Sequence, residues 1–164
     1  MERDPKSRLF LFKAGTLVNF AMDLHEVYMT TKLDGEKTFF LPFNQGNGEG
    51  VNAGAGNAPC EDDYPVHYMW DDILTKDTIL DLISKQTSEK ENEKTGKVEV
   101  KESIIFPRYH QLDAVRKLLA DVEENRTSLN YLIQHSAGSG KTNTIAWLAY
   151  RLATLHDADN KIIF

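Results

Sequence analysis

The apolar residues in the first part of the chain follow the pattern of β-strands. Three segments combine partial alternation with β-branched and aromatic side chains, namely residues 17–24, 27–33 and 38–43. The dipeptide Asp34-Gly35, between the last two segments, tolerates the positive φ angles of a tight hairpin turn. The pattern predicts an antiparallel β-meander of two or three strands, in which Pro42 ends the last strand or marks an edge.

A glycine-rich segment follows the predicted meander. Residues 44–59 hold five of the ten glycines and are predicted to form a surface loop. Gly46-Asn-Gly48 begins like a dinucleotide-binding fingerprint, but Val51 stands where the third glycine belongs and no helical pattern follows.

Helical spacing of apolar residues returns after this loop. Residues 67–84 are predicted to form one or two short amphipathic helices, the second capped by Asp77 or Thr78. Tyr68 and Trp70 are expected to pack beneath this acidic stretch rather than to bind a ligand. Residues 86–105, which are mostly polar and charged, are predicted to form a linker.

Beyond the linker the pattern alternates between helix and strand. It predicts a helix over residues 109–124, a short buried strand over 129–133, a second helix over 141–155 and the beginning of another strand over 161–164. The apolar faces of the two helices consist of Leu112, Val115, Leu118, Leu119 and Val122 in the first and Ile145, Leu148, Ala149 and Leu152 in the second. This order predicts an α/β fold for the second part of the chain.

Length, charge and cysteine content restrict the function classes. A chain of 164 residues has room for about one domain. Its net charge of −6 reflects residues 61–81, which carry seven acids and one lysine, whereas residues 101–164 carry eight basic and seven acidic side chains. The charge is therefore no argument against binding DNA.

Cys60 is the single cysteine, so an intrachain disulfide is excluded. The apolar runs are too short for export or a membrane span, so we expect a cytoplasmic protein without a membrane partner.

A candidate phosphate-binding site begins where the predicted strand meets the second helix. His135-Ser-Ala-Gly-Ser-Gly-Lys-Thr142 has the spacing of a P-loop, with His135 in place of the first glycine. In a P-loop, backbone N–H groups and a helix N-terminus bind phosphate, the lysine reaches the terminal phosphates and the hydroxyl binds Mg²⁺. A chance glycine turn that caps a helix is the alternative. The predicted nucleotide-binding residues are Ser136, Ala137, Gly138, Ser139, Gly140, Lys141 and Thr142, with Thr142 also the ligand of Mg²⁺.

Arg108 and Gln111 form a second candidate, about thirty residues before Lys141. A glutamine amide offers a donor and an acceptor side by side, which suits the edge of an adenine, and Arg108 places a guanidinium nearby. An exposed glutamine is ordinary on a helix. At this distance from a P-loop, however, the pair resembles the adenine-reading Q motif of superfamily 2 helicases and translocases.

Residues 106–115 and 130–149 together resemble the start of the motor domain of the type I restriction enzyme R subunit. Residues 26–31 and 40–46 are similar to the stretch that joins nuclease and motor in that family. The resemblance implies the end of a nuclease domain at residues 1–85, the linker at 86–105, and a truncated RecA-like domain at 106–164.

The resemblance also implies an activity and its partners. ATP would bind to Gly138 to Thr142 with Gln111 at the base, and its hydrolysis would drive translocation along double-stranded DNA, which an upstream nuclease cuts. The methylation and specificity subunits of a type I restriction complex would be further partners. The function implied for the full-length enzyme is ATP-dependent restriction of foreign DNA.

Two parts of the family pattern are not found in this sequence. Asp4-Pro-Lys6 and Glu99-Val-Lys101 match the last element of the nuclease motif, and we interpret both as chance matches in a charged chain. No Asp-Glu pair follows Thr142, although these acids share Mg²⁺ and orient water in the family. We therefore expect a fragment that binds nucleotide weakly without turnover. The alternatives are a fragment of another superfamily 2 helicase and a non-catalytic binding module.

Overall fold

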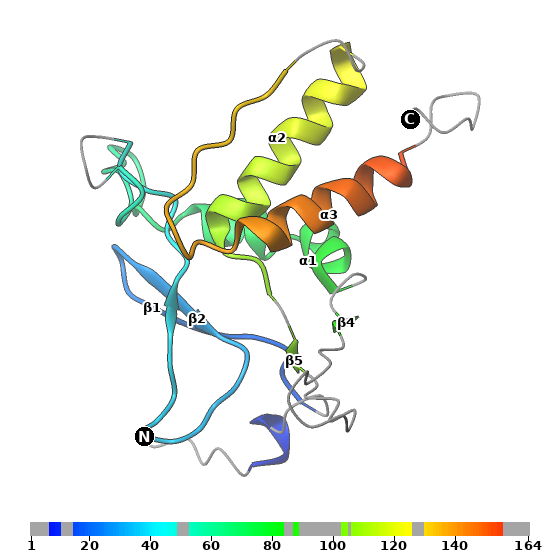
Figure 1. Ribbon diagram of the computed structural model, residues 1–164. Coiled ribbons are helices and arrows are strands. Elements are labelled where there is room, and N and C mark those ends of the chain that lie inside the picture. Colours follow the sequence, from blue (N-terminus) through cyan, green and yellow to red (C-terminus); the bar gives the residue numbers. More distant parts are fainter. Residues whose placement is uncertain are drawn as a thin grey trace, which may run out of the picture. The chain divides into compact units, whose positions relative to one another are not determined.

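The computed structural model describes residues 7–10, 15–48, 53–83, 87–88, 103–104, 106–125 and 130–155. The chain divides into two compact units, residues 1–106 and 107–164. The described part of the first unit contains a 3-10 turn at Arg8–Phe10, a small sheet and short helices, whereas that of the second contains two longer helices (Figure 1). None of the described helices is both long and apolar enough to cross a membrane.

The sheet of the first unit is the antiparallel meander that the sequence predicts. It consists of β1 (Asn19–Met22), β2 (Val27–Thr30) and β3 (Leu41–Pro42), in that order. Phe20 lies opposite Met29, and Met29 lies opposite Leu41. Pro42 occupies an edge strand whose neighbour among the described strands is β2, a position where a missing N–H is tolerated.

The turn at Asp34-Gly35 forms, but the tight hairpin predicted there does not. Gly35 has a φ of 52°, and the Asp34 carbonyl accepts a bond from the N–H of Lys37 at 3.0 Å. The Thr38 hydroxyl accepts from the Asp34 N–H at 2.8 Å and donates to the Gly35 carbonyl at 2.7 Å. Because this side chain closes the turn locally, strand pairing resumes only at Leu41.

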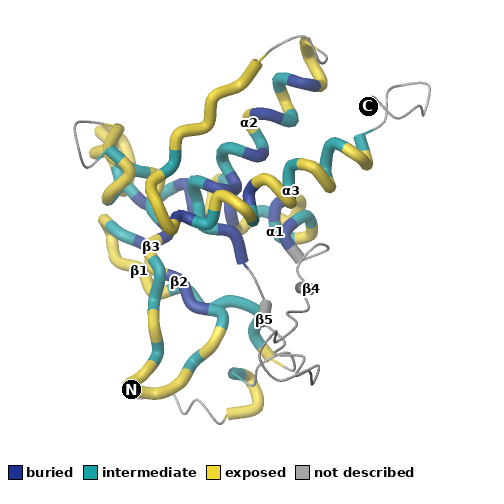
Figure 2. Tube along the Cα trace, viewed as in Figure 1, coloured by how far each residue is buried: buried dark blue, intermediate teal, exposed yellow. Residues whose placement is uncertain are grey.

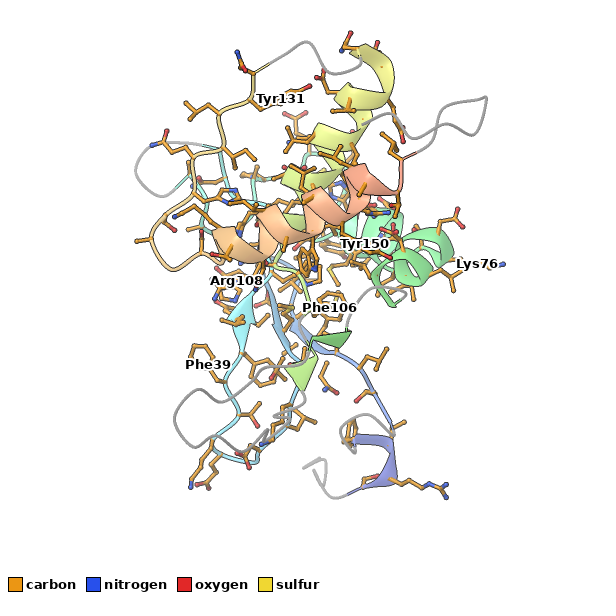
Figure 3. The ribbon with its side chains drawn as sticks, turned by 45° about the vertical axis from the view of Figure 1, so that its right-hand side comes forward. Phe39, Lys76, Phe106, Arg108, Tyr131 and Tyr150 are labelled. Carbon is orange, nitrogen blue, oxygen red and sulfur yellow. The ribbon has the colours of Figure 1, made fainter. Side chains whose placement is uncertain are left out.

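Three phenylalanine rings of the first unit contact one another. The centroid of Phe43 lies 5.4 Å from that of Phe20 and 6.1 Å from that of Phe106. Phe106, which the predicted domain boundary groups with the second part, thus contacts the first (Figure 3). Other buried apolar residues of this unit are Val27, Met29, Val66, Tyr68, Met69, Ile73 and Leu82 (Figure 2).

Two short helices form within the acidic stretch of the first unit. A π-helical turn spans Met69–Ile73, and α1 spans Lys76–Ile83. Tyr68 is buried as expected, and its hydroxyl donates to the Phe43 carbonyl at 2.6 Å. Trp70 was expected to pack but is 43% exposed, because Met69 and Ile73 occupy the inward positions of this turn.

The predicted cap of α1 is displaced. The helix begins at Lys76, so Asp77 and Thr78 lie in its first turn rather than at the N-cap. The Thr78 hydroxyl contacts the Asp72 carboxylate at 3.5 Å, which ties the first turn of α1 to the preceding π-helical turn. An acid in the first turn still interacts favourably with the helix dipole.

The glycine-rich segment is held by side-chain amides. Asn57 donates to the His25 carbonyl at 2.8 Å and accepts from the Gln45 N–H at 2.8 Å. Asn44 accepts from the N–H of Val27 at 2.8 Å, which fastens the start of the segment to β2. These hydrogen bonds fix the backbone in the described part of the predicted surface loop.

The ends of the predicted linker pair with one another. β4 (Thr87–Ser88) and β5 (Ser103–Ile104) form a two-stranded antiparallel ladder. The residues between them, 89–102, lie outside the described part of the chain. The linker therefore begins and ends in one hydrogen-bonded element.

The second unit is built on α2 (Tyr109–Asn125) and α3 (Lys141–Ala153), which contact one another (Figure 1). α2 buries the face that the sequence predicts, apart from Leu119, which is half-buried. α3 does not bury its predicted face: Ile145 is 65% exposed, and Thr144 is its buried residue.

The strand predicted at residues 129–133 is absent from the described residues of this segment, 130–133. They have no ladder partner, and Leu132 is 92% exposed. An apolar run becomes a buried strand only where neighbouring strands complete its hydrogen bonds. The strand predicted at residues 161–164 lies outside the described residues.

Candidate phosphate-binding site

The P-loop residues form a tight turn that leads directly into α3. Gly138 and Gly140 adopt φ angles of 74° and 85°, in the left-handed region that favours glycine. Gly140 is the N-cap of α3, and no side chain caps the helix there. The first turn of α3 therefore presents its backbone N–H groups without a side-chain acceptor.

Several N–H groups of this loop have no acceptor within the described part of the chain. They belong to Gly138, Gly140, Lys141 and Thr142, whereas the N–H of Ser139 donates to the Ser136 carbonyl at 3.3 Å. Unpaired N–H groups at a helix N-terminus, next to glycines that add no Cβ, form a concave site for an anion. The backbone thus fits the phosphates of a nucleotide.

Lys141 folds back over the beginning of the loop. Its ammonium donates to the His135 carbonyl at 3.1 Å and to the Ser136 carbonyl at 2.8 Å. The side chain is exposed, so the charge lies at the surface of the loop. Carbonyl groups are weaker partners than an anion for an ammonium, so these contacts are exchangeable for phosphate oxygens.

Gln111 is buried and its amide is engaged within the protein. The Nε2 group donates to the carbonyls of Gly140 at 2.9 Å and Ser139 at 3.3 Å, and Oε1 accepts from the Arg108 N–H at 2.9 Å. Gln111 therefore fastens α2 to the P-loop. A base edge would have to replace these carbonyls before the same amide could pair with adenine.

A pair of histidines lies beside this glutamine. The ring of His110 meets that of His135 edge to face, with centroids 4.8 Å apart, and His110 Nε2 lies 3.1 Å from the Ser139 carbonyl. Burial lowers the pKa of His110 below its usual range, against the effect of the Ser139 carbonyl, so the neutral ring is favoured. The sequence does not predict these contacts of His110, and its position beside Gln111 is the one signal that could have suggested them.

Thr142 is exposed in the first turn of α3, so its hydroxyl is accessible to a metal ion bound with phosphate. Among the described residues, no cluster of three or more histidine, cysteine or acidic side chains could hold a metal by itself. A single exposed hydroxyl is compatible with Mg²⁺ that is bound together with phosphates, since Mg²⁺ commonly takes few protein ligands.

The remaining predicted site residues belong to the same loop or to the start of α2. Ser136 and Ala137 are exposed, and Arg108 is half-buried just before α2. Ser139 and Thr144 are buried, and their hydroxyl groups have no hydrogen-bond partner within the described residues. The structure thus brings all nine predicted residues, from Arg108 and Gln111 to the P-loop, into one unit.

Comparison with protein families relates this site to ATP-driven enzymes. The sequence profile of a family described as "Type III restriction enzyme, res subunit" matches residues 104–164, which include the P-loop and α2 but less than half of the chain. The match relates this part to restriction-enzyme and superfamily 2 helicase-like ATPases, without distinguishing type I from type III. Comparisons with curated proteins and with solved structures found no match.

Proposed function

We propose that residues 107–164 bind ATP with Mg²⁺ and that the chain is part of the DNA-translocating and DNA-cleaving subunit of a type I restriction enzyme. The observation that carries nucleotide binding is the loop from Gly138 to Thr142. Its two glycines hold left-handed φ angles, and a lysine lies over it. The N–H groups of Gly138, Gly140, Lys141 and Thr142 have no acceptor among the residues that the structure describes. This combination suits a polyphosphate better than a plain helix cap.

Each residue has a defined task in the proposed complex. The N–H groups of Gly138, Gly140 and Lys141 donate to phosphate oxygens, and the Lys141 ammonium exchanges backbone carbonyls for the terminal phosphates. The Thr142 hydroxyl would bind Mg²⁺, which when bound neutralises charge on the terminal phosphates. Gln111 keeps the loop on α2 throughout.

The type I assignment rests on two resemblances to the R subunit of type I restriction enzymes. Residues 106–115 and 130–149 resemble the start of its motor domain, and residues 26–31 and 40–46 resemble the stretch that joins nuclease and motor. The family match at residues 104–164 favours a second candidate, the motor of a type III restriction enzyme or of another superfamily 2 helicase. Co-purification with type I methylation and specificity subunits separates the two. Complex formation without nucleotide binding would instead support a non-catalytic binding module.

Nucleotide binding is tested by titrating the full chain with a fluorescent ATP analogue and Mg²⁺. We expect saturable binding that Lys141→Ala weakens at least tenfold, because a charge-assisted bond to phosphate contributes about 1.5–3 kcal/mol. Lys117→Ala is the matched control, since Lys117 is an exposed lysine that pairs with Asp113 at 2.8 Å on α2. Equal affinity of both variants, or no binding by the wild type, would contradict the proposal.

A further inference from the structure

His110 of α2 contacts the P-loop at two points. His135 is the first residue of the loop, and its ring meets that of His110 at an interplanar angle of 82°. His110 also reaches the middle of the loop, where its Nε2 lies 3.1 Å from the Ser139 carbonyl. A carbonyl accepts and cannot donate, so the proton of the neutral His110 ring lies on Nε2.

The direction of the loop carbonyls determines the direction of the N–H groups that follow them. In a trans peptide the C=O of one residue and the N–H of the next point in opposite directions, and the described chain contains no cis peptide. His110 and Gln111 draw the Ser139 carbonyl toward α2, and Gln111 also holds the Gly140 carbonyl. The N–H groups of Gly140 and Lys141 are therefore turned away from α2.

The first position of the loop supports this arrangement by packing. His135 is half-buried, and its Nδ1 is buried without a hydrogen-bond partner among the described residues. The ring therefore acts through its contact with His110 rather than through a bond from Nδ1. Glycine, the usual residue of a P-loop at this position, would leave that contact empty.

We propose that His110 and His135 are positioning residues of the phosphate site, which hold the P-loop on α2 so that the N–H groups of Gly140 and Lys141 face the phosphates. This inference rests on the proposed nucleotide binding. It assigns the pair to the phosphates and not to the base, because the contacts they make are with the loop backbone. The histidines then act equally on any polyphosphate, with or without adenine.

The test measures the affinity of the full chain for Mg²⁺·ATP and for inorganic tripolyphosphate. His110→Asn is expected to weaken both about three- to tenfold, the equivalent of one hydrogen bond, because its amide is too short to reach the Ser139 carbonyl. His110→Gln places an amide N–H near the position of Nε2 and is expected to restore both affinities. Both substitutions introduce a carboxamide and differ in its reach. A general effect of replacing the histidine would therefore lower the affinities of both variants equally.

His135 is tested by a second matched pair. His135→Phe keeps the edge-to-face ring contact and removes the unpartnered nitrogen, so its affinity is expected to equal that of the wild type. His135→Gly restores the usual P-loop residue but removes the ring, and it is expected to bind both ligands about three- to tenfold more weakly. Tighter binding by His135→Gly would overturn the proposal.

The remaining outcomes separate this inference from the proposed function. If the wild type does not bind ATP, or if Lys141→Ala binds as well as wild type, the proposed function fails. If Lys141→Ala loses binding while His110→Asn matches His110→Gln, the proposed function stands and the positioning role is wrong. A loss of affinity for ATP but not for tripolyphosphate would also overturn it, since that result would indicate contact with the base.

Discussion

At the scale of single residues, Gly138 and Gly140 share a backbone conformation but differ in the space around their Cα atoms. Both lie in the left-handed region. A Cβ on Gly138 would have no heavy atom within 4 Å, whereas a Cβ on Gly140 would lie 2.5 Å from Gln111 Nε2. Gly140 is therefore needed both for its φ angle and for the space that Gln111 occupies.

This difference predicts unequal costs for the two alanine substitutions. Gly138→Ala is expected to lower the free energy of unfolding of the second unit by about 1–2 kcal/mol, the cost of a left-handed alanine. Gly140→Ala is expected to cost about 2–4 kcal/mol, because Gln111 must also give up its bonds to two backbone carbonyls. Denaturant unfolding measures both values, and equal costs would contradict the role assigned to Gln111.

Gln111 also marks the limit of sequence reasoning at this scale. Its spacing from the P-loop predicts a shared site, and the structure brings the two together. The acceptors of its Nε2 group, however, are backbone carbonyls 28 and 29 residues further along the chain. No local pattern specifies such partners, so a glutamine that looks like an exposed reader of a base is in fact buried against the loop.

At the scale of elements, α2 and α3 differ in how much of their apolar faces is covered. Leu118 of α2 is 8% exposed, whereas Ile145 of α3 is 65% exposed. Both residues belong to faces that helical periodicity predicts equally well. The periodicity identifies which side chains share a face, but burial depends on what the rest of the chain places against it.

Two truncations test this difference. Leu118→Ala is expected to lower the stability of α2 by about 2–4 kcal/mol, because it leaves a cavity in a packed face. Ile145→Ala is expected to change the stability by less than about 0.5 kcal/mol, as is usual for an exposed position. Hydrogen exchange of the α2 and α3 amides reports both changes. A large loss for Ile145→Ala would show that another element covers α3 in solution.

The segment before the P-loop also differs from what its local pattern predicts. Tyr131 lies on this segment beside α2 and donates its hydroxyl to the Asp121 carboxylate (Figure 3). The bond raises the pKa of Tyr131, because the neutral phenol is the donor. A side chain thus anchors the segment to α2 where the sequence predicts strand hydrogen bonds.

At the scale of the whole molecule, the separation into two units explains why global composition says little about function. The acids of residues 61–81 lie in the first unit and the P-loop lies in the second. The net charge of −6 therefore describes a region outside the candidate phosphate site. The length likewise suggests one domain, whereas the fold has two compact units.

The whole chain is expected to bind Mg²⁺·ATP without hydrolysing it. Residues 143–164 contain no Asp-Glu pair that could hold Mg²⁺ together with Thr142 and orient water. Phosphate release from a polypeptide of these 164 residues should equal that of buffer, with or without double-stranded DNA. Turnover that Lys141→Ala abolishes would show that other groups supply this function.

The sequence alone determined the meander, the helix α2 and the P-loop turn, because each depends on neighbours within a few residues: strand alternation, helical spacing, and glycines before a lysine. Only the tertiary structure decided that Trp70 and Ile145 stay exposed and that residues 130–133 form no strand. It also decided that His110 and Gln111 contact the backbone of the loop. These outcomes depend on contacts between distant segments, and the free energy of such contacts is not contained in a local pattern.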